Sequence, residues 1–205
     1  AEKHCTYNVA SVSKIYCTAA IMVLVQRGLI SLDTPVVQVI PEFKMLDEDY
    51  KKITVRHLLN HASGLPGTQW KGFSVTALTE RDYDKEVLNY LANSHLKAKP
   101  GEYSVYCNDG FTLAEIIVAR VSGQRYSDFL RENIAGPIHA DSTRTIEDRN
   151  PDYPLVHEKA KPAELLLVEG AGGLTTSMID LCKFGQLFLS ENPILSEASK
   201  QEMAK

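Results

Sequence analysis

The longest helical pattern of apolar residues covers about residues 11–27, and Gly28 follows it as a stop signal. Apolar side chains recur at helical spacing through this stretch and also fill most of the positions between. We expect Ile15, Ala19 and Met22 to be among the buried positions. A helix that is apolar on most of its sides is predicted to lie at the centre of the fold.

Shorter helical patterns follow along the chain. They cover about residues 54–59, 84–93, 110–121, 126–134 and 176–190, with a last one from Ser196. Thr54 is a predicted helix cap, and the spacing of Thr112 and Glu115 predicts a capping box. Residues 141–169 are proline-rich and weakly periodic, which indicates an irregular segment. Few strands are visible, so the chain as given is predicted to be mainly α.

Composition is that of one ordinary globular domain. The 205 residues include 22 Lys and Arg against 26 Asp and Glu, with 44% hydrophobic residues, and show neither an internal repeat nor a linker. We therefore treat residues 1–205 as a single domain. A net charge of −4 without basic clusters argues against nucleic acid, and the longest unbroken apolar run, residues 19–25, is too short for a transmembrane segment.

The four cysteines lie far apart and form no Cys-x-x-Cys pair. They are Cys5, Cys17, Cys107 and Cys182. This spacing gives no zinc-ribbon or thioredoxin-like signature. Reduced thiols that pack as small apolar groups are the favoured interpretation, while the even number leaves disulfides open.

A Ser-x-x-Lys pattern stands at the start of the long apolar helix, where Ser11 and Lys14 share one helix face. A chain of this size shows such a pattern by chance, and Ser94 and Lys97 form a second one. Ser94 falls at the frayed end of a polar helix. Ser11 opens a buried helix, where the dipole and free N–H groups favour an oxyanion.

The only Tyr-x-Asn in the chain is Tyr106-Cys107-Asn108. A phenol that faces a Ser/Lys pair can hold or relay a proton, and an amide can hydrogen-bond an acyl substrate. Judged alone, the tripeptide is equally consistent with a half-buried loop tyrosine beside a capping asparagine. We do not assign Cys107 as a nucleophile, because its side chain is expected to point away from the side on which Tyr106 and Asn108 lie.

Four segments together carry a family resemblance. They are residues 10–14, 58–66, 100–108 and 171–174. In this order and at these spacings, they resemble the serine β-lactamase and penicillin-binding-protein superfamily, in particular its class C β-lactamase-like, esterase and D-alanyl-D-alanine peptidase branch. The resemblance covers nearly the whole chain. It implies the helical region of the α/β β-lactamase/transpeptidase-like fold.

The resemblance implies a serine hydrolase in which Ser11 attacks a β-lactam, ester or peptide carbonyl and forms an acyl-enzyme. Lys14 is then the base and Tyr106 the group that takes or relays the proton. A lysine with its ordinary pKa of about 10.4 is a poor base at neutral pH. Burial and polar neighbours must therefore favour its neutral form.

The same resemblance implies that Asn108, Gly172 and Gly173 contact the substrate, a small molecule or peptide. The two glycines are also typical of a tight backbone approach. The mechanism uses neither a metal nor an organic cofactor. One oxyanion donor is expected to be the backbone N–H of Ser11.

One element of the family is missing. Its third motif is a strand with Lys or His, usually Ser or Thr, and then Gly, but residues 99–101 and 183–185 fall in a turn and a helix. The strands that flank the helical region are also absent from this sequence. We therefore expect a domain that is incomplete at both ends, lacks most of its antiparallel sheet and self-associates through uncovered apolar faces.

Several alternatives stay open at this stage. His57 and His61 are four apart, but no Glu stands beside His57 as in HExxH, so capping or packing is favoured over a metal site. Trp70 could border a substrate cleft, although a structural loop aromatic is the simpler interpretation. The rival function is a non-catalytic binding or sensing scaffold, or an inactive fragment. The compartment is open, since relatives include envelope, periplasmic, secreted and cytoplasmic proteins.

Overall fold

The computed structural model describes residues 5–76, 82–146, 148, 152–156 and 164–205. Part of the irregular segment predicted for residues 141–169 lies outside the described residues, namely 147, 149–151 and 157–163. The described chain is mainly helical, as predicted.

Helices make up most of the regular secondary structure of the described residues. The α-helices are α1 (Ser13–Gln26), α2 (Val36–Val39), α3 (Val55–Leu59), α4 (Tyr83–Ala92), α5 (Asn108–Ser122), α6 (Tyr126–Leu130), α7 (Glu169–Gly172), α8 (Met178–Gln186) and α9 (Glu197–Met203). Short 3-10 turns cover Ala10–Val12, Glu48–Lys52 and Gly136–Ile138, and Arg131–Ala135 forms a π-helical turn. The positions of α1, α3, α4, α5, α6, α8 and α9 agree with the predicted helices to within a few residues, whereas α2 and α7 were not predicted.

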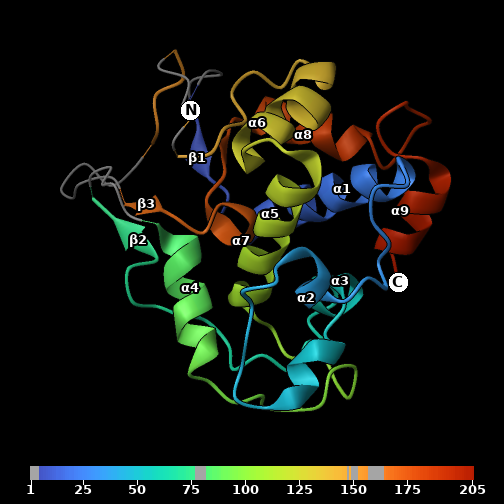
Figure 1. The fold of residues 1–205 in the computed structure, drawn as a ribbon. Coiled ribbons are helices and arrows are strands. Elements are labelled where there is room, and N and C mark those ends of the chain that lie inside the picture. The colour runs from blue at the N-terminus through green and yellow to red at the C-terminus, as the bar shows by residue number, and fades with distance from the viewer. Residues whose placement is uncertain (1–4, 77–81, 147, 149–151, 157–163) are drawn as a thin grey trace.

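Helices α1 and α5 form the centre of the fold, with α1 crossing α5 (Figure 1). Both also pack against α7. The side chains of Tyr16, Ile21 and Leu24 are fully buried, so the prediction of a central apolar helix is confirmed. Ile15 was expected to be buried, and this is wrong: it is 46% exposed, because no described element covers that side of the first turn.

The start of α5 differs from the predicted one. The helix begins at Asn108 and not at Gly110, so Thr112 and Glu115 lie in its interior and the predicted capping box is wrong. Both side chains are buried, and the Glu115 carboxyl accepts a hydrogen bond from the N–H of Gly170. Burial against α7 has therefore overridden a local pattern that is typical of a helix start.

Side-chain caps define several of the other helix starts. Thr54 caps α3 by accepting the N–H of His57, while Nδ1 of His57 accepts the N–H of Thr54. The side chains of Ser177 and Ser196 cap α8 and α9 by accepting the backbone N–H of Asp180 and of Ser199. The predicted Thr54 cap and the predicted capping role of His57 are thus confirmed.

Two antiparallel pairs of very short strands complete the described fold. Strand β1 (Tyr7–Asn8) pairs with β4 (Thr175–Thr176), and β2 (Ser74–Val75) pairs with β3 (Leu165–Leu166). Two residues per strand are too few to produce an alternating pattern in the sequence. The first pair ties the residues before Ser11 to the residues after Gly173.

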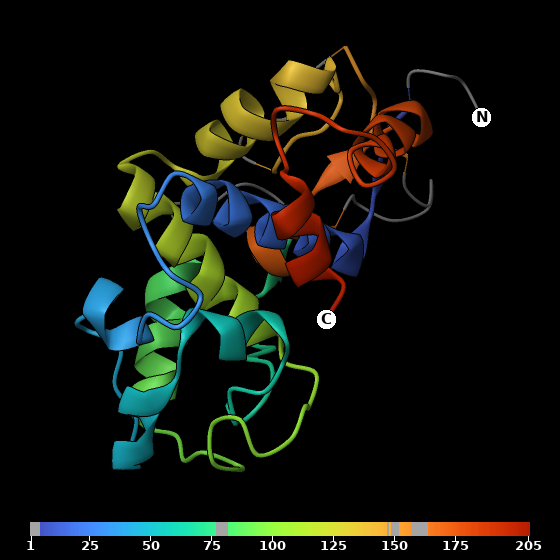
Figure 2. The same cartoon turned by 90° about the vertical axis from the view of Figure 1, so that its right-hand side faces the viewer.

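The last helix lies against the C-terminal end of α1 (Figure 2). Gln26 makes the connection: its Oε1 accepts the N–H of Ser196 at 2.8 Å and the hydroxyl of Ser199 at 2.5 Å. Its Nε2 donates to the carbonyl of Ile194 at 3.0 Å. Among the described residues, no helix is both long and apolar enough to cross a bilayer.

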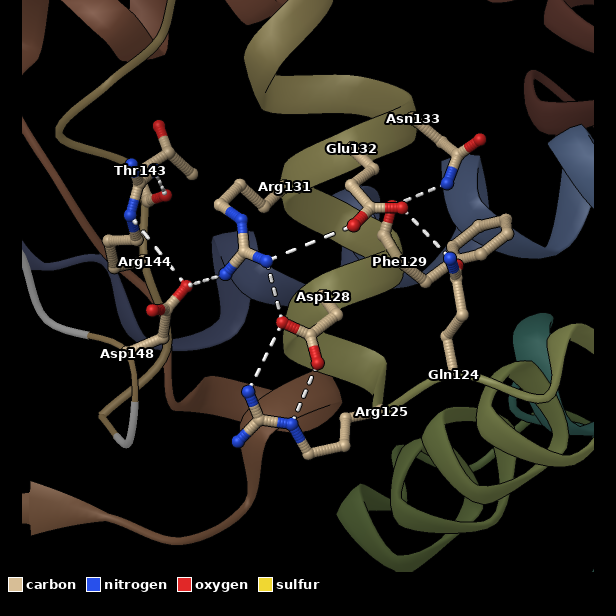
Figure 3. Close-up of polar contacts among 10 residues, drawn as sticks. All are labelled: Gln124, Arg125, Asp128, Phe129, Arg131, Glu132, Asn133, Thr143, Arg144 and Asp148. Carbon is tan, nitrogen blue, oxygen red and sulfur yellow. Dashed lines mark hydrogen bonds and ion pairs between the residues drawn. The ribbon is translucent and has the colours of Figure 1, made fainter.

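An ion-pair network fastens α6 and its π-helical turn to the following segment (Figure 3). Arg131 donates to Asp128 at 2.7 Å and to Asp148 at 2.7 Å, and Arg125 reaches the other side of Asp128. Single surface pairs contribute little to stability. Here one arginine joins two carboxylates from different segments, so the network fixes their relative position.

The stacked pair of Tyr16 and Phe184 joins α8 to α1, with ring centroids 3.6 Å apart. We expect Phe184→Ala to lower the free energy of unfolding by about 3–5 kcal/mol, because it leaves a cavity beside a buried ring. Urea denaturation measures the change. The control Leu189→Ala, at a side chain that is 86% exposed, is expected to change it by less than about 0.5 kcal/mol. A similar loss in both variants would contradict this packing.

Candidate active site

Ser11 lies in the 3-10 turn that leads directly into α1. Asn8 holds this turn: its Oδ1 accepts the N–H of Ala10 at 2.9 Å and its Nδ2 donates to the carbonyl of Gly172 at 3.1 Å. Ala10 has a positive φ of 44°, which an alanine adopts only when its surroundings enforce it. The side chain of Ser11 is thereby presented on the surface, next to α7.

Lys14 occupies the first turn of α1, three positions after Ser11, and is only 6% exposed. Its Nζ donates to Ser11 Oγ at 3.3 Å, to Asn108 Oδ1 at 2.7 Å and to the carbonyl of Ala171 at 2.5 Å. Burial lowers the pKa of Lys14, and the neighbouring Tyr106 opposes this shift in part. The site therefore favours the neutral amine more than water does.

Tyr106 completes the contact with Ser11, since its hydroxyl is hydrogen-bonded to Ser11 Oγ. The ring lies beside Lys14, whose Nζ is 4.8 Å from the ring centroid. The structure thus brings together the two motifs that stand 92 residues apart in the sequence, from Lys14 to Tyr106.

Asn108 is the first residue of α5, and both the oxygen and the nitrogen of its side-chain amide are hydrogen-bonded. Its Oδ1 accepts from Lys14, and its Nδ2 donates to Thr68 Oγ1 at 3.1 Å. The next residue, Asp109, accepts the backbone N–H of Gln69 at 2.9 Å. The start of α5 therefore positions both the lysine and the segment around Thr68.

Gly172 and Gly173 lie at the end of α7, beneath the turn that carries Ser11. A Cβ on Gly173 would meet the carbonyl oxygen of Leu166 at 2.7 Å, so the predicted tight backbone approach is confirmed there. At Gly172 it is wrong, because a Cβ would find its nearest neighbours at 3.6 Å, an ordinary contact. Glu115 anchors the other end of α7 through Gly170, and burial raises the pKa of the Glu115 carboxyl well above its ordinary value. Contact of the glycine pair with a substrate stays a prediction.

The second Ser-x-x-Lys pattern has a local structural role. Ser94 follows the end of α4, and its hydroxyl donates to the carbonyl of Tyr90 at 2.7 Å.

Cys107 is buried with its Sγ 2.9 Å from the carbonyl of Gly67, and burial raises its pKa to about 11. It is therefore held as a thiol whose Sγ contacts the carbonyl of Gly67. All four cysteines are free, as the favoured interpretation predicts, but only Cys17 and Cys107 are buried, while Cys182 is exposed.

Three contributors to the site were missed by the sequence analysis. They are the imidazole of His61, the hydroxyl of Thr68 and the carbonyl of Ala171. The ring of His61 lies 4.6 Å from that of Tyr106, centroid to centroid. The signal in the sequence was that His61 and Ala171 each stand inside one of the four family-like segments. Trp70, on the segment that follows Thr68, is 62% exposed. The described residues contain no cluster of side chains that could hold a metal ion.

Comparison with known proteins gives a consistent result. The family model described as Beta-lactamase matches residues 6–205. Penicillin-binding protein 4* of Bacillus subtilis (strain 168) is 27% identical over 218 residues, which cover 95% of this chain and 47% of that protein. The chain thus spans about half the length of this relative.

Solved structures share the fold. A D-stereospecific amidohydrolase from Streptomyces sp. superposes with a TM-score of 0.81 at 22% identity, over 98% of this chain and 66% of that one. The octameric penicillin-binding protein homologue from Pyrococcus abyssi gives 0.78 at 24% identity, over 100% of this chain and 50% of that one.

Asp109 supplies a test of the site's packing, because burial raises its pKa to about 6. The folded state then holds this proton more tightly than the unfolded state, whose Asp pKa is about 3.9, so stability falls as pH rises between these values. Asp109→Asn keeps an oxygen acceptor for the N–H of Gln69 but cannot ionise. We expect the variant to gain about 2–3 kcal/mol relative to the parent protein between pH 4 and pH 7.

Urea denaturation at the two pH values measures this gain. Glu102→Gln, at an exposed carboxyl in the loop before α5, is the matched control. A difference between Asp109→Asn and the parent protein that is the same at both pH values would show that Asp109 is not held in this way.

Proposed function

Because the chain belongs to the β-lactamase family of serine hydrolases, we propose that Ser11 attacks the carbonyl carbon of a β-lactam, an ester or a D-amino-acid peptide and forms an acyl-enzyme. The observation that carries the proposal is the double contact on one oxygen. Ser11 Oγ is within hydrogen-bond distance of both Lys14 Nζ and the Tyr106 hydroxyl. A nucleophile with a base in reach is the basic requirement for acyl transfer.

The contacts of Lys14 support its role as the base. A neutral amine has two protons and one lone pair. Asn108 Oδ1 and the carbonyl of Ala171 are the two closest acceptors and take the two protons. The lone pair then faces Ser11 Oγ and can accept its proton as the oxygen attacks.

Tyr106 is suited to the second half of the step. The bond from Ser11 Oγ to the carbonyl carbon forms, and the bond from that carbon to the leaving nitrogen or oxygen breaks. The proton that Lys14 has taken passes through the Tyr106 hydroxyl to the leaving atom. Water then attacks the acyl-enzyme carbonyl and releases the acid, which restores the Ser11 hydroxyl. The oxyanion that forms in each step would lie near the backbone N–H of Ser11.

The names of the relatives support the proposed substrate range. A penicillin-binding protein and a D-stereospecific amidohydrolase are both similar to this chain, and the second is named for an amide of defined stereochemistry. In this proposal Asn108 also contacts such an acyl group, in addition to its hydrogen bond with Lys14. The alternative is a scaffold that binds such molecules without turnover.

Self-association is a further part of the proposal. Large apolar side chains stay exposed, among them Ile15 at 46% and Met178 at 63%. The homologue from Pyrococcus abyssi is octameric, which supports an assembly for this protein too.

Intact mass after treatment with a fluorophosphonate and, separately, with a penicillin tests the proposal on protein expressed from the complete reading frame. We expect one adduct per chain, which Ser11→Ala abolishes and Ser94→Ala retains, because Ser94 belongs to the second Ser-x-x-Lys pattern. The lifetime of the penicillin adduct separates a β-lactamase from a penicillin-binding protein. Folded protein without an adduct, or an adduct that survives in Ser11→Ala, would refute the acyl-enzyme.

Replacement of Lys14 tests the base. An arginine keeps its charge at every practical pH, so Lys14→Arg is expected to slow fluorophosphonate labelling by about 100- to 10,000-fold. Lys14→Met, which is neutral and of similar length, should lose as much, whereas Lys97→Arg should lose nothing. In the parent protein, labelling should fall as pH falls through the lowered pKa of Lys14, since protonation removes the lone pair. Unchanged labelling in Lys14→Met would exclude Lys14 as the base.

A further inference from the structure

His61 follows the end of α3 and has a positive φ of 60°. Residues other than glycine rarely adopt this left-handed conformation, and Asn, Asp and His do so more readily than others. The conformation turns both the carbonyl and the side chain of His61 toward the loop that carries Tyr106. Strained residues of this kind persist where surrounding contacts enforce them, and they cluster at functional sites.

Both neighbours of Tyr106 in the chain are hydrogen-bonded to His61. The N–H of Val105 donates to the carbonyl of His61 at 2.9 Å, and the N–H of Cys107 donates to its Nδ1 at 3.2 Å. One residue therefore holds the backbone on each side of the tyrosine. The ring of His61 also packs between the rings of Tyr106 and Phe111, with centroids 4.6 and 5.2 Å away.

The bond to Cys107 requires a neutral imidazole with its proton on Nε2, because Nδ1 accepts. The groups that bear on this ring from the described elements are Lys14 on α1, and the Tyr106 phenol and the backbone N–H of Cys107 beside the start of α5. Burial lowers the pKa of His61, and the charge of Lys14 lowers it further. A proton added to Nδ1 would turn this acceptor into a donor that faces a second donor, the N–H of Cys107. The hydrogen bond between them would then be lost.

We propose that His61 is a positioning residue that holds the Tyr106 hydroxyl on Ser11 while its imidazole is neutral, and that protonation of the ring releases the tyrosine. The proposal rests on the proposed function of Ser11 and adds to it an acid switch outside the reacting groups. His61 does not touch Ser11, so it acts through Tyr106. A displaced phenol would leave Ser11 with Lys14 alone and without a path for the proton to the leaving group.

Two substitutions separate the parts of this role. His61→Asn keeps an acceptor close to the position of Nδ1, tolerates the left-handed backbone and cannot titrate in this range. His61→Phe keeps an aromatic ring but has no acceptor for the N–H of Cys107. His57→Asn is the matched control, because His57 lies one helical turn earlier and caps α3.

The first measurement is the rate of fluorophosphonate labelling from about pH 8 down to the acid limit of the native fold. Each required deprotonation adds one to the slope of the logarithm of the rate against pH. In the parent protein and in His57→Asn, we expect this slope to reach about two in acid, one for Lys14 and one for His61. In His61→Asn, the slope should stay at about one. His61→Phe should be slower by about 100-fold at every pH, because Tyr106 is misplaced.

The second measurement does not depend on activity. In the NMR spectrum of the parent protein, the amide resonance of Cys107 should move with the titration of the His61 imidazole, and this movement should be absent in His61→Asn. A Cys107 amide that stays unmoved while the imidazole titrates would overturn the proposal, as would a slope of two in His61→Asn. Folded parent protein that is never labelled at Ser11 would refute the proposed function instead, and the NMR titration would still decide whether His61 holds the loop.

Discussion

The site depends on the burial of one amine. Lys14 is almost completely removed from solvent, and an amine in such a place needs acceptors for its protons. The two closest acceptors lie on the first residue of α5 and on a carbonyl of α7, and Ser11 Oγ, in the turn before α1, is the third polar partner. The acceptors have this geometry only if α5 and α7 both pack on α1, which the apolar surface of α1 ensures. The core of the fold and the chemistry of the site thus share one set of contacts.

Local patterns were sufficient to predict part of the molecule. The spacing of Ser11 and Lys14 places both on one helix face, and this holds in the structure because helical geometry is local. The capping pattern of Thr112 and Glu115 was equally local and yet wrong, since burial of Glu115 against α7 outweighed it. The two strand pairs were invisible because each strand has only two residues.

The remaining parts of the site arise from contacts that no local pattern encodes. The carbonyl of Ala171 is a backbone group, so its role leaves no trace in the residue type. Thr68 and His61 reach Asn108 and Tyr106 from 40 or more positions away in the chain. The two strained backbones at Ala10 and His61 likewise follow from tertiary structure, and they lie directly beside Ser11 and Tyr106. The conformational cost at these two residues is matched by the hydrogen bonds that hold them.

Three main-chain hydrogen bonds fasten the loop of residues 97–107 to the segment that follows α3, beside side-chain contacts such as that of the Ser104 hydroxyl with the carbonyl of Asn60. The N–H groups of Lys97, Gly101 and Val105 donate to carbonyls of residues 61–64. Gly64 permits the closest approach, because a Cβ there would lie 2.1 Å from the carbonyl oxygen of Ala98. Outward-facing side chains such as Tyr103 take no part in this attachment. Substitutions on the outer surface of the loop can therefore change what this surface meets while the position of the Tyr106 phenol is preserved.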